Sequence, residues 1–272
     1  MRRIGVLMDL SADDPVGQDR LAAFLQGLQE AGWSVGRNVR IDTRWAAVET
    51  DRIRRYVEEL VALVPDVIFA STSRVVAMLQ QATRTIPIVF AAVTDPVPAG
   101  FVDSLARPGG NTTGFTSAEY GMSAKWLELL KEIAPGVTRV GVLHEPSNPG
   151  SLPTIATFAR SPNAGLIVTR LTEAISNREL IVTLAARHRL PAIYPLRPFV
   201  TSGGLISYGP DTVNLYRQAA GYVDRILRGA KPADLPVEAP TKYETVLNMK
   251  TPKALGLDIP ATVFARADEI IE

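Results

Sequence analysis

The chain has 272 residues, of which 46% are hydrophobic and 21% are charged. This length is enough for a large buried core and for more than one domain of typical size. The 29 basic and 28 acidic residues leave a net charge of +1, which argues against a nucleic-acid partner and against a basic membrane-binding patch. Because there is no cysteine, disulfides and thiol catalysis are excluded.

No apolar run approaches the length needed to cross a bilayer, so we expect no direct membrane insertion. Met1-Arg2-Arg3 is followed by an apolar run that Asp9 ends after Met8, which is too short for the apolar region of a signal peptide. We interpret this run as the first strand of a folded domain and expect no export signal in the given chain.

Short apolar runs rich in β-branched residues alternate with helical patterns along the first part of the chain. Such alternation is typical of βαβ units, which build a doubly wound parallel sheet, and we therefore predict the α/β fold class. The predicted elements, in chain order, are the strand Ile4–Met8, the helix Gly17–Ala31, the strand Val39–Trp45, the helix Asp51–Leu63, the strand Val67–Ala70, the helix Arg74–Thr83 and the strand Ile88–Val93.

The strand pattern then begins again. Three echoes in the same order predict two Rossmann-like lobes of similar topology. Arg3-Ile-Gly-Val-Leu-Met is echoed by Arg139-Val-Gly-Val-Leu-His, Asp66-Val-Ile-Phe-Ala-Ser by Ala164-Gly-Leu-Ile-Val-Thr, and Pro87-Ile-Val-Phe by Pro191-Ala-Ile-Tyr.

The spacing of the echoes differs between the lobes. From Arg3 to Asp66 is 63 residues, whereas from Arg139 to Ala164 is only 25, so the second lobe is 38 residues shorter at this point. Only Pro153–Ser161 remains to cross between two parallel strands, which is close to the shortest possible crossover. We therefore predict that the second lobe is shortened.

Six segments of the chain carry a family resemblance, namely Ala106-Arg-Pro-Gly-Gly-Asn-Thr-Thr-Gly, Trp126-Leu-Glu-Leu-Leu-Lys-Glu-Ile-Ala-Pro, Gly204-Leu-Ile-Ser-Tyr-Gly-Pro, Lys231-Pro-Ala-Asp-Leu-Pro-Val-Glu, Asn248-Met-Lys-Thr-Pro-Lys-Ala-Leu-Gly-Leu and Ala267-Asp-Glu-Ile-Ile-Glu. Together they resemble the family of ABC transporter substrate-binding proteins that includes tryptophan- and tyrosine-binding members. The resemblance covers nearly the whole chain and implies a type I periplasmic-binding fold, with two lobes joined by hinge strands and a ligand in the cleft.

On this basis we assign residues 1–116 and about 209–237 to the N-terminal lobe, and residues 117–208 and about 238–272 to the C-terminal lobe. The chain departs from the family pattern in two places. Family members usually begin with a secretion signal, and they usually carry a helix–strand–helix stretch where this chain is short after Gly150.

Ligands of open parallel sheets sit beyond the carboxyl ends of the strands, so candidate binding residues are those that follow each strand. Ser71 and Ser73 open a helix, where hydroxyl and backbone N–H groups can bind an anion such as an amino-acid carboxylate. The alternative for Ser73 is a simple N-cap. Thr94 and Asp95 follow another strand; Asp95 is a candidate partner for a ligand ammonium, or else a turn former before Pro96.

The remaining candidates are Asp211, Tyr194, Tyr208 and Phe115. Asp211 precedes a predicted helix at Val213–Leu227 and can serve as its N-cap instead of touching ligand. The aromatic residues are candidates to wall an aromatic or apolar substrate, although strand-end tyrosines commonly pack in a core. Phe115 and Tyr208 also lie close to the expected hinge crossings.

No catalytic, metal or cofactor motif is present: there is no G-x-S-x-G, no H-E-x-x-H and no phosphate-binding glycine loop. Hence we expect neither enzymatic chemistry nor a cofactor. The leading interpretation is the periplasmic or extracytoplasmic solute-binding component of an ABC importer. We expect a monomer that binds an amino acid or similar small organic molecule and docks on a membrane permease. The alternatives are a cytoplasmic small-molecule sensor of the same fold and a degenerate paralogue that no longer binds.

Overall fold

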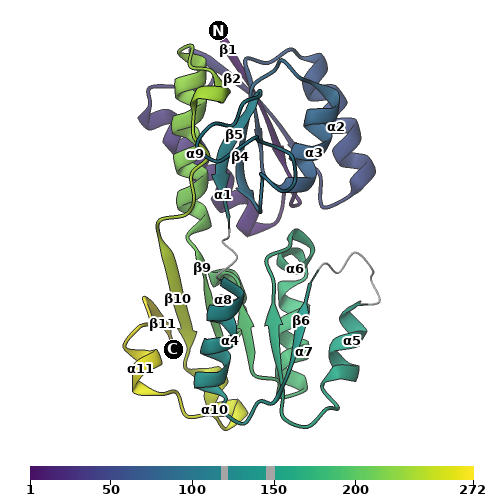
Figure 1. The fold of residues 1–272 in the computed structure, drawn as a ribbon, viewed down its shortest axis with the longest axis vertical. Coiled ribbons are helices and arrows are strands. Elements are labelled where there is room, and N and C mark those ends of the chain that lie inside the picture. The colour runs from purple at the N-terminus through teal and green to yellow at the C-terminus, as the bar shows by residue number, and fades with distance from the viewer. Residues whose placement is uncertain (118–121, 145–150) are drawn as a thin grey trace. The chain divides into compact units, whose positions relative to one another are not determined.

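The computed structural model describes residues 1–117, 122–144 and 151–272, and the chain divides into two compact units (Figure 1). Unit 1 comprises residues 1–119 and 211–241, and unit 2 comprises residues 120–210 and 242–272. The chain therefore passes between the units three times, after residues 119, 210 and 241, where the sequence placed the passages after residues 116, 208 and 237.

Unit 1 is built on five parallel strands in the order β2-β1-β3-β4-β5. All residues of β3, β4 and β5 are buried, as expected of strands covered on both faces. The four predicted strands are confirmed within two residues at either end. The strands are β1 (Arg2–Met8), β2 (Val39–Trp45), β3 (Val67–Ala70), β4 (Ile88–Val93) and β5 (Thr112–Thr116).

The helices of unit 1 cover both faces of this sheet, and each predicted helix is found within two residues of its expected ends. They are α1 (Pro15–Glu30), α2 (Thr50–Ala62), α3 (Ser73–Ala82) and α9 (Thr212–Leu227), followed by the short 3-10 helix η1 (Pro232–Asp234). Because side chains alternate along β3, Val67 and Phe69 pack against α1 and α9, whereas Ile68 packs on the side of α2 and α3.

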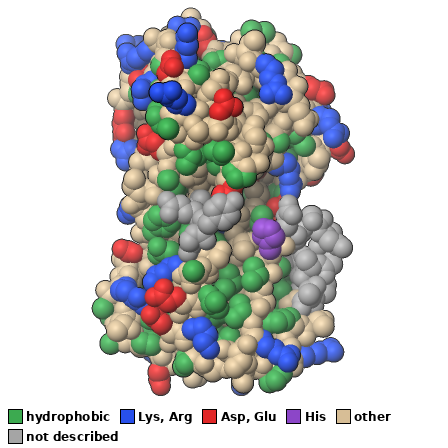
Figure 2. All heavy atoms as spheres, viewed as in Figure 1, with side chains coloured by type: hydrophobic (Ala, Val, Ile, Leu, Met, Phe, Trp, Pro, Cys, Tyr) green, Lys and Arg blue, Asp and Glu red, His purple; other side chains and the backbone are tan. Residues whose placement is uncertain are grey.

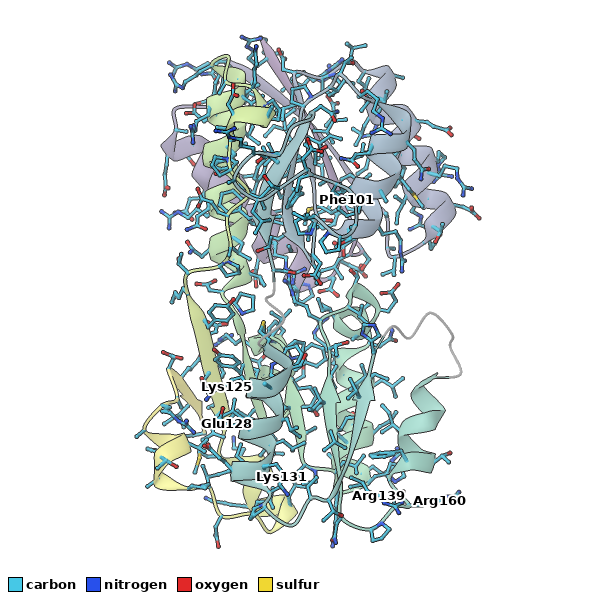
Figure 3. The ribbon with its side chains drawn as sticks, viewed as in Figure 1. Phe101, Lys125, Glu128, Lys131, Arg139 and Arg160 are labelled. Carbon is cyan, nitrogen blue, oxygen red and sulfur yellow. The ribbon has the colours of Figure 1, made fainter. Side chains whose placement is uncertain are left out.

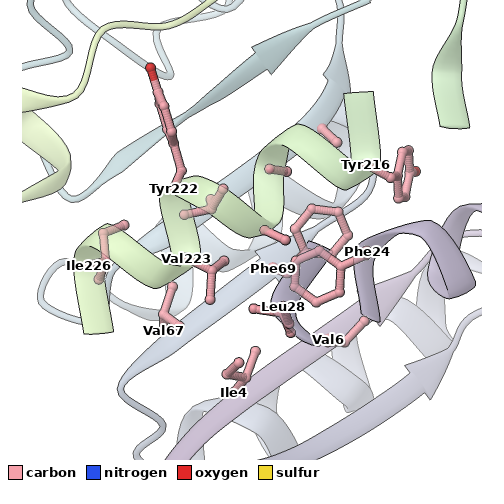
Figure 4. Packing of buried hydrophobic residues seen from close by; sticks show 14 of the residues in the cluster. Ile4, Val6, Phe24, Leu28, Val67, Phe69, Tyr216, Tyr222, Val223 and Ile226 are labelled. Atoms are coloured by element: carbon pink, nitrogen blue, oxygen red, sulfur yellow. The ribbon is translucent and has the colours of Figure 1, made fainter. Parts of the chain in front are cut away.

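The rings of Phe24 in α1 and Phe69 in β3 stack with centroids 4.3 Å apart, at the centre of the core that α1 and α9 close (Figure 4). Tyr216 of α9 meets Phe69 edge-on at 5.4 Å. Both arrangements are favoured by the ring quadrupoles. The second segment of unit 1 therefore contributes directly to its core.

Unit 2 contains a six-stranded sheet in the order β11-β10-β9-β8-β7-β6. Strands β6 to β9 are parallel, as predicted, but β10 runs antiparallel to β9, and β11 is parallel to β10. This antiparallel pair was not predicted. The strands are β6 (Arg139–Leu143), β7 (Ala164–Val168), β8 (Ala192–Tyr194), β9 (Ile206–Pro210), β10 (Tyr243–Asn248) and β11 (Glu269–Ile271).

The helix α4 (Met122–Ile133) shows how the helices of unit 2 meet this sheet. Five of its residues, Trp126 among them, are buried, and the Trp126 Nε1 donates a hydrogen bond of 2.7 Å to the carbonyl of Tyr208 in β9. Lys125 and Glu128 form an exposed ion pair of 3.0 Å along the same helix (Figure 3). The other helices are α5 (Ser151–Phe158), α6 (Thr172–Ser176), α7 (Arg178–Arg187), α8 (Arg197–Thr201), α10 (Lys250–Leu255) and α11 (Ala261–Phe264).

The internal echo corresponds to a shared strand order. In unit 1 the strands β1, β3 and β4 are neighbours, and in unit 2 the echoing strands β6, β7 and β8 are neighbours in the same sequence. A Cβ added at Gly5 of β1 would contact Leu60 of α2. A Cβ added at the echoing Gly141 of β6 would contact Phe158 of α5. Thus α5 is the counterpart of α2, and α1 and β2 have no counterpart between β6 and β7 in the described part of the chain.

This omission leaves β6 at the edge of its sheet. Val142 of β6 echoes Val6 of β1, but Val142 is 58% exposed whereas Val6 is completely buried beneath α1 and α9. The neighbouring Ile167 of β7 is buried, so the cover ends between β7 and β6. Hydrophobic side chains are correspondingly visible on the face of unit 2 shown in Figure 2. The second lobe is shortened by one covering helix and one edge strand.

Candidate functional site

The candidate site of unit 1 lies where β1, β3 and β4 end. We call the residues Asp9, Ser71, Ser73, Thr94 and Asp95 the unit 1 edge. Because the carboxyl ends of parallel strands meet at one edge of a sheet, residues far apart in the sequence come together here.

Ser71 and Asp9 are locked to each other by two hydrogen bonds. The Ser71 Oγ accepts from the backbone N of Asp9 at 2.9 Å and donates to the Asp9 Oδ1 at 2.8 Å, and both residues are buried. The Tyr216 hydroxyl donates to the Ser71 carbonyl at 3.4 Å. Ser71 therefore fixes the end of β3 to the end of β1.

Three helices of unit 1 are capped differently at their first residues. Asp14 caps α1 by accepting from the Val16 N at 2.9 Å, and Asp211 caps α9 by accepting from the Asn214 N at 3.0 Å. The N-cap of α3 is Thr72, whose side chain makes no such hydrogen bond. Glu49, the N-cap of α2, likewise makes no such hydrogen bond. At the start of α3 this leaves room for an anion to take the place of a side-chain cap.

Ser73 is the first residue of α3, so the alternative that it is the N-cap is wrong. Its Oγ instead accepts from the backbone N of Thr94 at 3.4 Å. The Thr94 Oγ1 lies 3.1 Å from the Ser117 Oγ, and Thr94 itself is exposed. The structure therefore brings the end of β4 against the start of α3.

Asp95 occupies a turn directly after β4. Its φ of 47° lies in the left-handed region, which aspartate tolerates better than most residues, and its carbonyl accepts from the Ala99 N at 3.1 Å. A second left-handed residue, Ala92 with φ of 65°, coincides with a register shift between β4 and β5. The turn role of Asp95 is confirmed, and its half-buried side chain stays a candidate ligand contact.

Phe115 and Asp211 have well-defined structural partners in unit 1. Phe115 is buried and its ring lies 4.8 Å from that of Tyr222 in α9. Asp211 is half-buried and acts as the N-cap described above, as its alternative assignment predicted. Ligand contact by either residue stays a prediction.

The two tyrosine candidates belong to unit 2. Tyr194 is 1% exposed, stacks on Phe199 at 5.2 Å, and its burial raises the pKa of its hydroxyl above the usual 10.0. Tyr208 is half-buried and stacks on Tyr243 at 5.8 Å. Of the two, Tyr208 retains accessible surface.

Arg20 of α1 also belongs to this region, although the sequence analysis did not select it. It is only 2% exposed, and its Nε and Nη2 atoms have no hydrogen-bond partner among the described residues. Its guanidinium carbon lies 5.6 Å from the centroid of the Tyr216 ring. The signal was present in the sequence, because Arg20 interrupts the apolar face formed by Val16, Phe24 and Leu28 at helical spacing.

A pocket of about 630 Å³ in unit 2 lies at the opposite end of its strands. It is lined by residues that precede β6, β7 and β8, including Val137, Asn163 and Pro191, together with His188 and Leu257. Ligands of parallel sheets bind beyond the carboxyl ends, so this pocket does not share the location of the candidate site.

The groups of the unit 1 edge are hydroxyls, backbone N–H groups and carboxylates, which suit reversible binding of a polar small molecule. Within residues 1–117, 122–144 and 151–272, no three His, Asp or Glu side chains are grouped so as to hold a metal ion. No helix in the same residues has the length and apolar character needed to traverse a bilayer.

Two α/β units with parallel strands that end in polar loops define the class of two-lobed binding proteins. The model of the ABC transporter substrate binding protein family matches residues 4–173 and 152–271, and the chain belongs to this family. Residues 152–173 fall in both matched ranges. Membership implies a small-molecule ligand and a permease partner.

The comparisons with individual proteins agree with this assignment. The chain is 26% identical over 262 residues to a tyrosine-binding protein of Clostridioides difficile, a match that covers 86% of this chain and 75% of that protein. Among solved structures, it resembles an ABC domain from Streptococcus pneumoniae in complex with L-Trp, with a TM-score of 0.91 and 25% identity over 99% of both chains. A conserved domain protein from Vibrio cholerae gives a TM-score of 0.85 and 26% identity over 99% of both chains.

Proposed function

We propose that this protein is the solute-binding component of an ABC importer and that it binds an amino acid, with aromatic amino acids as the preferred class. Two similar proteins named above bind tyrosine or are seen with L-Trp. Binding is reversible and involves no chemistry. The protein acts as an extracytoplasmic monomer that delivers its ligand to a membrane permease.

The observation that carries this proposal is the uncapped N-terminus of α3. Amide groups at the start of a helix, here with the Ser73 hydroxyl beside them, are suited to a carboxylate. Ser71 does not bind the ligand in this proposal but holds the start of α3 in position, because its hydrogen bonds to Asp9 fix the backbone that leads into the helix.

The remaining contacts follow from the chemistry of an amino acid. In the proposed complex the half-buried Asp95 accepts from the ligand ammonium, and the neighbouring Thr94, an exposed residue, is a second polar contact. Tyr208 is the proposed aromatic contact from unit 2, since its ring is only half-buried while that of Tyr194 packs inside the core. Aromatic side chains of a ligand favour stacked or edge-on rings.

The test is a thermal-shift screen of the purified protein against the amino acids, with sugars and nucleosides as comparison sets, followed by calorimetric titration of the best ligand. A ligand that binds only the folded protein stabilises it and so raises its Tm. At a ligand concentration one hundred times Kd, the free energy of unfolding increases by about 3 kcal/mol. We expect the largest shifts with L-tyrosine and L-tryptophan. No shift across all three sets would contradict the proposal and favour a protein that no longer binds.

Two variants test the proposed contacts. Ser73→Ala and Asp95→Ala are each expected to lower the affinity for the identified ligand about 10-fold or more, because each removes one hydrogen bond to a charged group. Ser104→Ala is the matched control, because Ser104 forms its bonds with Arg107 within an exposed turn. Unchanged affinity in both test variants would show that the ligand binds elsewhere.

A further inference from the structure

Arg20 presents a physical problem that the fold of unit 1 does not solve. An arginine side chain stays protonated in proteins, so its burial places a permanent positive charge in the interior. Such charges are normally paired, because an unpaired buried ion is costly. Arg20 is 2% exposed, its Nε and Nη2 atoms lack hydrogen-bond partners among the described residues, and its guanidinium carbon lies 5.6 Å from the centroid of the Tyr216 ring.

The location of Arg20 connects it to the unit 1 edge. It lies in the second turn of α1, and this helix begins close to the carboxyl end of β1. The Tyr216 ring links Arg20 to β3, since the Tyr216 hydroxyl donates to the Ser71 carbonyl immediately before α3. The guanidinium therefore lies on the same side of the sheet core as Ser71, one aromatic ring away from it.

We infer that Arg20 supplies the positive charge that binds the anionic group of the ligand, and that the solutes of this protein are consequently carboxylates. This inference rests on the proposed function and deepens it. The ligand carboxylate would accept from the Nε and Nη2 of Arg20 as well as from the start of α3. Arginine is suited to this role because its planar donors match the two oxygens of a carboxylate.

The experiment compares a carboxylate ligand with its neutral amide. Calorimetric titrations with L-tryptophan and L-tryptophanamide, and with L-tyrosine and L-tyrosinamide, are made on the wild type and on Arg20→Met. We expect the wild type to prefer the acid about 10- to 100-fold, and Arg20→Met to reduce this preference to about threefold or less. Arg217→Met is the control, because Arg217 is exposed and already pairs with Glu30.

The Tm of the ligand-free protein gives a second readout, which the two explanations of Arg20 predict to change in opposite directions. Removing an unpaired buried charge is expected to leave the Tm of Arg20→Met unchanged or higher. A purely structural Arg20 predicts the reverse, a lower Tm with the acid-to-amide preference intact, and that pair of results would overturn the inference. Arg20→Gln is measured in parallel, so that a neutral variant is available if Arg20→Met does not fold.

The outcomes also separate this inference from the proposed function. If the wild type binds the amino acids but Arg20→Met and Arg20→Gln keep the wild-type preference for the acid, only the role of Arg20 is wrong. If the wild type binds none of the four probes and no other amino acid in the thermal-shift screen, the proposed function itself is contradicted and the carboxylate assignment falls with it.

Discussion

The Ser71 hydroxyl holds Asp9 through two bonds at once, accepting from its backbone N at 2.9 Å and donating to its carboxylate at 2.8 Å. Both residues are buried, so neither group can exchange these bonds for water without local opening. The pair joins the ends of two neighbouring strands at the point where the candidate site begins.

Ser71→Ala is therefore expected to destabilise unit 1 by about 1–3 kcal/mol, because it leaves a buried carboxylate and a buried N–H without this partner. Ser73→Ala should cost much less stability, since Ser73 is half-buried and its Oγ accepts only a 3.4 Å bond from Thr94. Urea unfolding of both variants makes the comparison. Equal losses of stability would contradict the structural role assigned to Ser71.

Val6 of β1 and Val142 of β6 occupy equivalent positions in the two units, so the same substitution at each tests whether the second unit lacks a covering helix. Val6→Ala removes methyl groups from a closed core and is expected to cost about 2 kcal/mol. Val142→Ala, at the echoing but exposed position, is expected to change stability by about 0.5 kcal/mol or less. Hydrogen exchange of peptides from β1 and β6 measures each unit separately. A large effect at Val142 would mean that something covers β6 in solution.

Glu269 and Arg197 connect β11 to α8 through two parallel hydrogen bonds of 2.6 and 2.7 Å. These bonds lower the pKa of Glu269 below its ordinary 4.5. The stabilisation is therefore complete above pH 4.5 and is lost as the pH falls through the lowered pKa of the folded state. Because both groups are partly exposed, we expect about 1 kcal/mol or less.

The corresponding measurement is the Tm of Glu269→Gln against wild type as a function of pH. The wild type should be the more stable at neutral pH, and the difference should disappear in acid. Glu179→Gln, a change on the exposed side of α7, controls for the loss of one negative charge. A difference that persists after the pH has fallen well below the lowered pKa of Glu269 would exclude titration of this carboxylate as its cause.

Gly114 is expected to tolerate no side chain. Its φ is 151°, and a Cβ at this position would lie 2.1 Å from the Phe90 carbonyl oxygen on the neighbouring strand. Gly114→Ala should therefore prevent correct pairing of β4 and β5 and reduce the soluble yield. Gly110→Ala, four residues earlier in an open turn, has no such contact and should express like wild type. Equal yields of the two variants would contradict this reading.

Much of the fold could be predicted because buried parallel strands have a strong local signal. The runs at β3 and β4 are apolar at almost every position, and their predicted bounds agree with the structure. The echo at Arg139 predicted the neighbouring strands of unit 2 and their parallel direction. The shortening of unit 2 after β6 could be predicted from the number of residues between the echoed segments.

The direction of β10 could not be predicted in the same way. Nothing in the run Tyr243–Asn248 indicates its partner, and it is antiparallel because the chain re-enters unit 2 beside β9 after completing unit 1. The N-cap of α3 was placed one residue too late, since Thr72 and Ser73 are both good cap residues and only the backbone conformation decides between them.

The candidate site was harder still, because burial and pairing depend on distant residues. Tyr194 ends a strand just as Tyr208 lies near the end of another, yet Phe199 of α8 covers the first ring and leaves it inside the core. Arg20 was visible as a charge on an apolar helix face, but its lack of a partner is a property of the folded unit. No local pattern encodes such an absence.

Because the chain passes between the units three times, neither unit is made in one continuous stretch during biosynthesis. The core of unit 1 includes Tyr216, Val223 and other side chains of α9, which the ribosome makes after all of the strands β6 to β9 of unit 2. Unit 1 cannot close over its own sheet while it emerges first from the exit tunnel. Both halves of the molecule must remain incomplete until residue 241 has been translated, so folding of this chain is governed by its last segments.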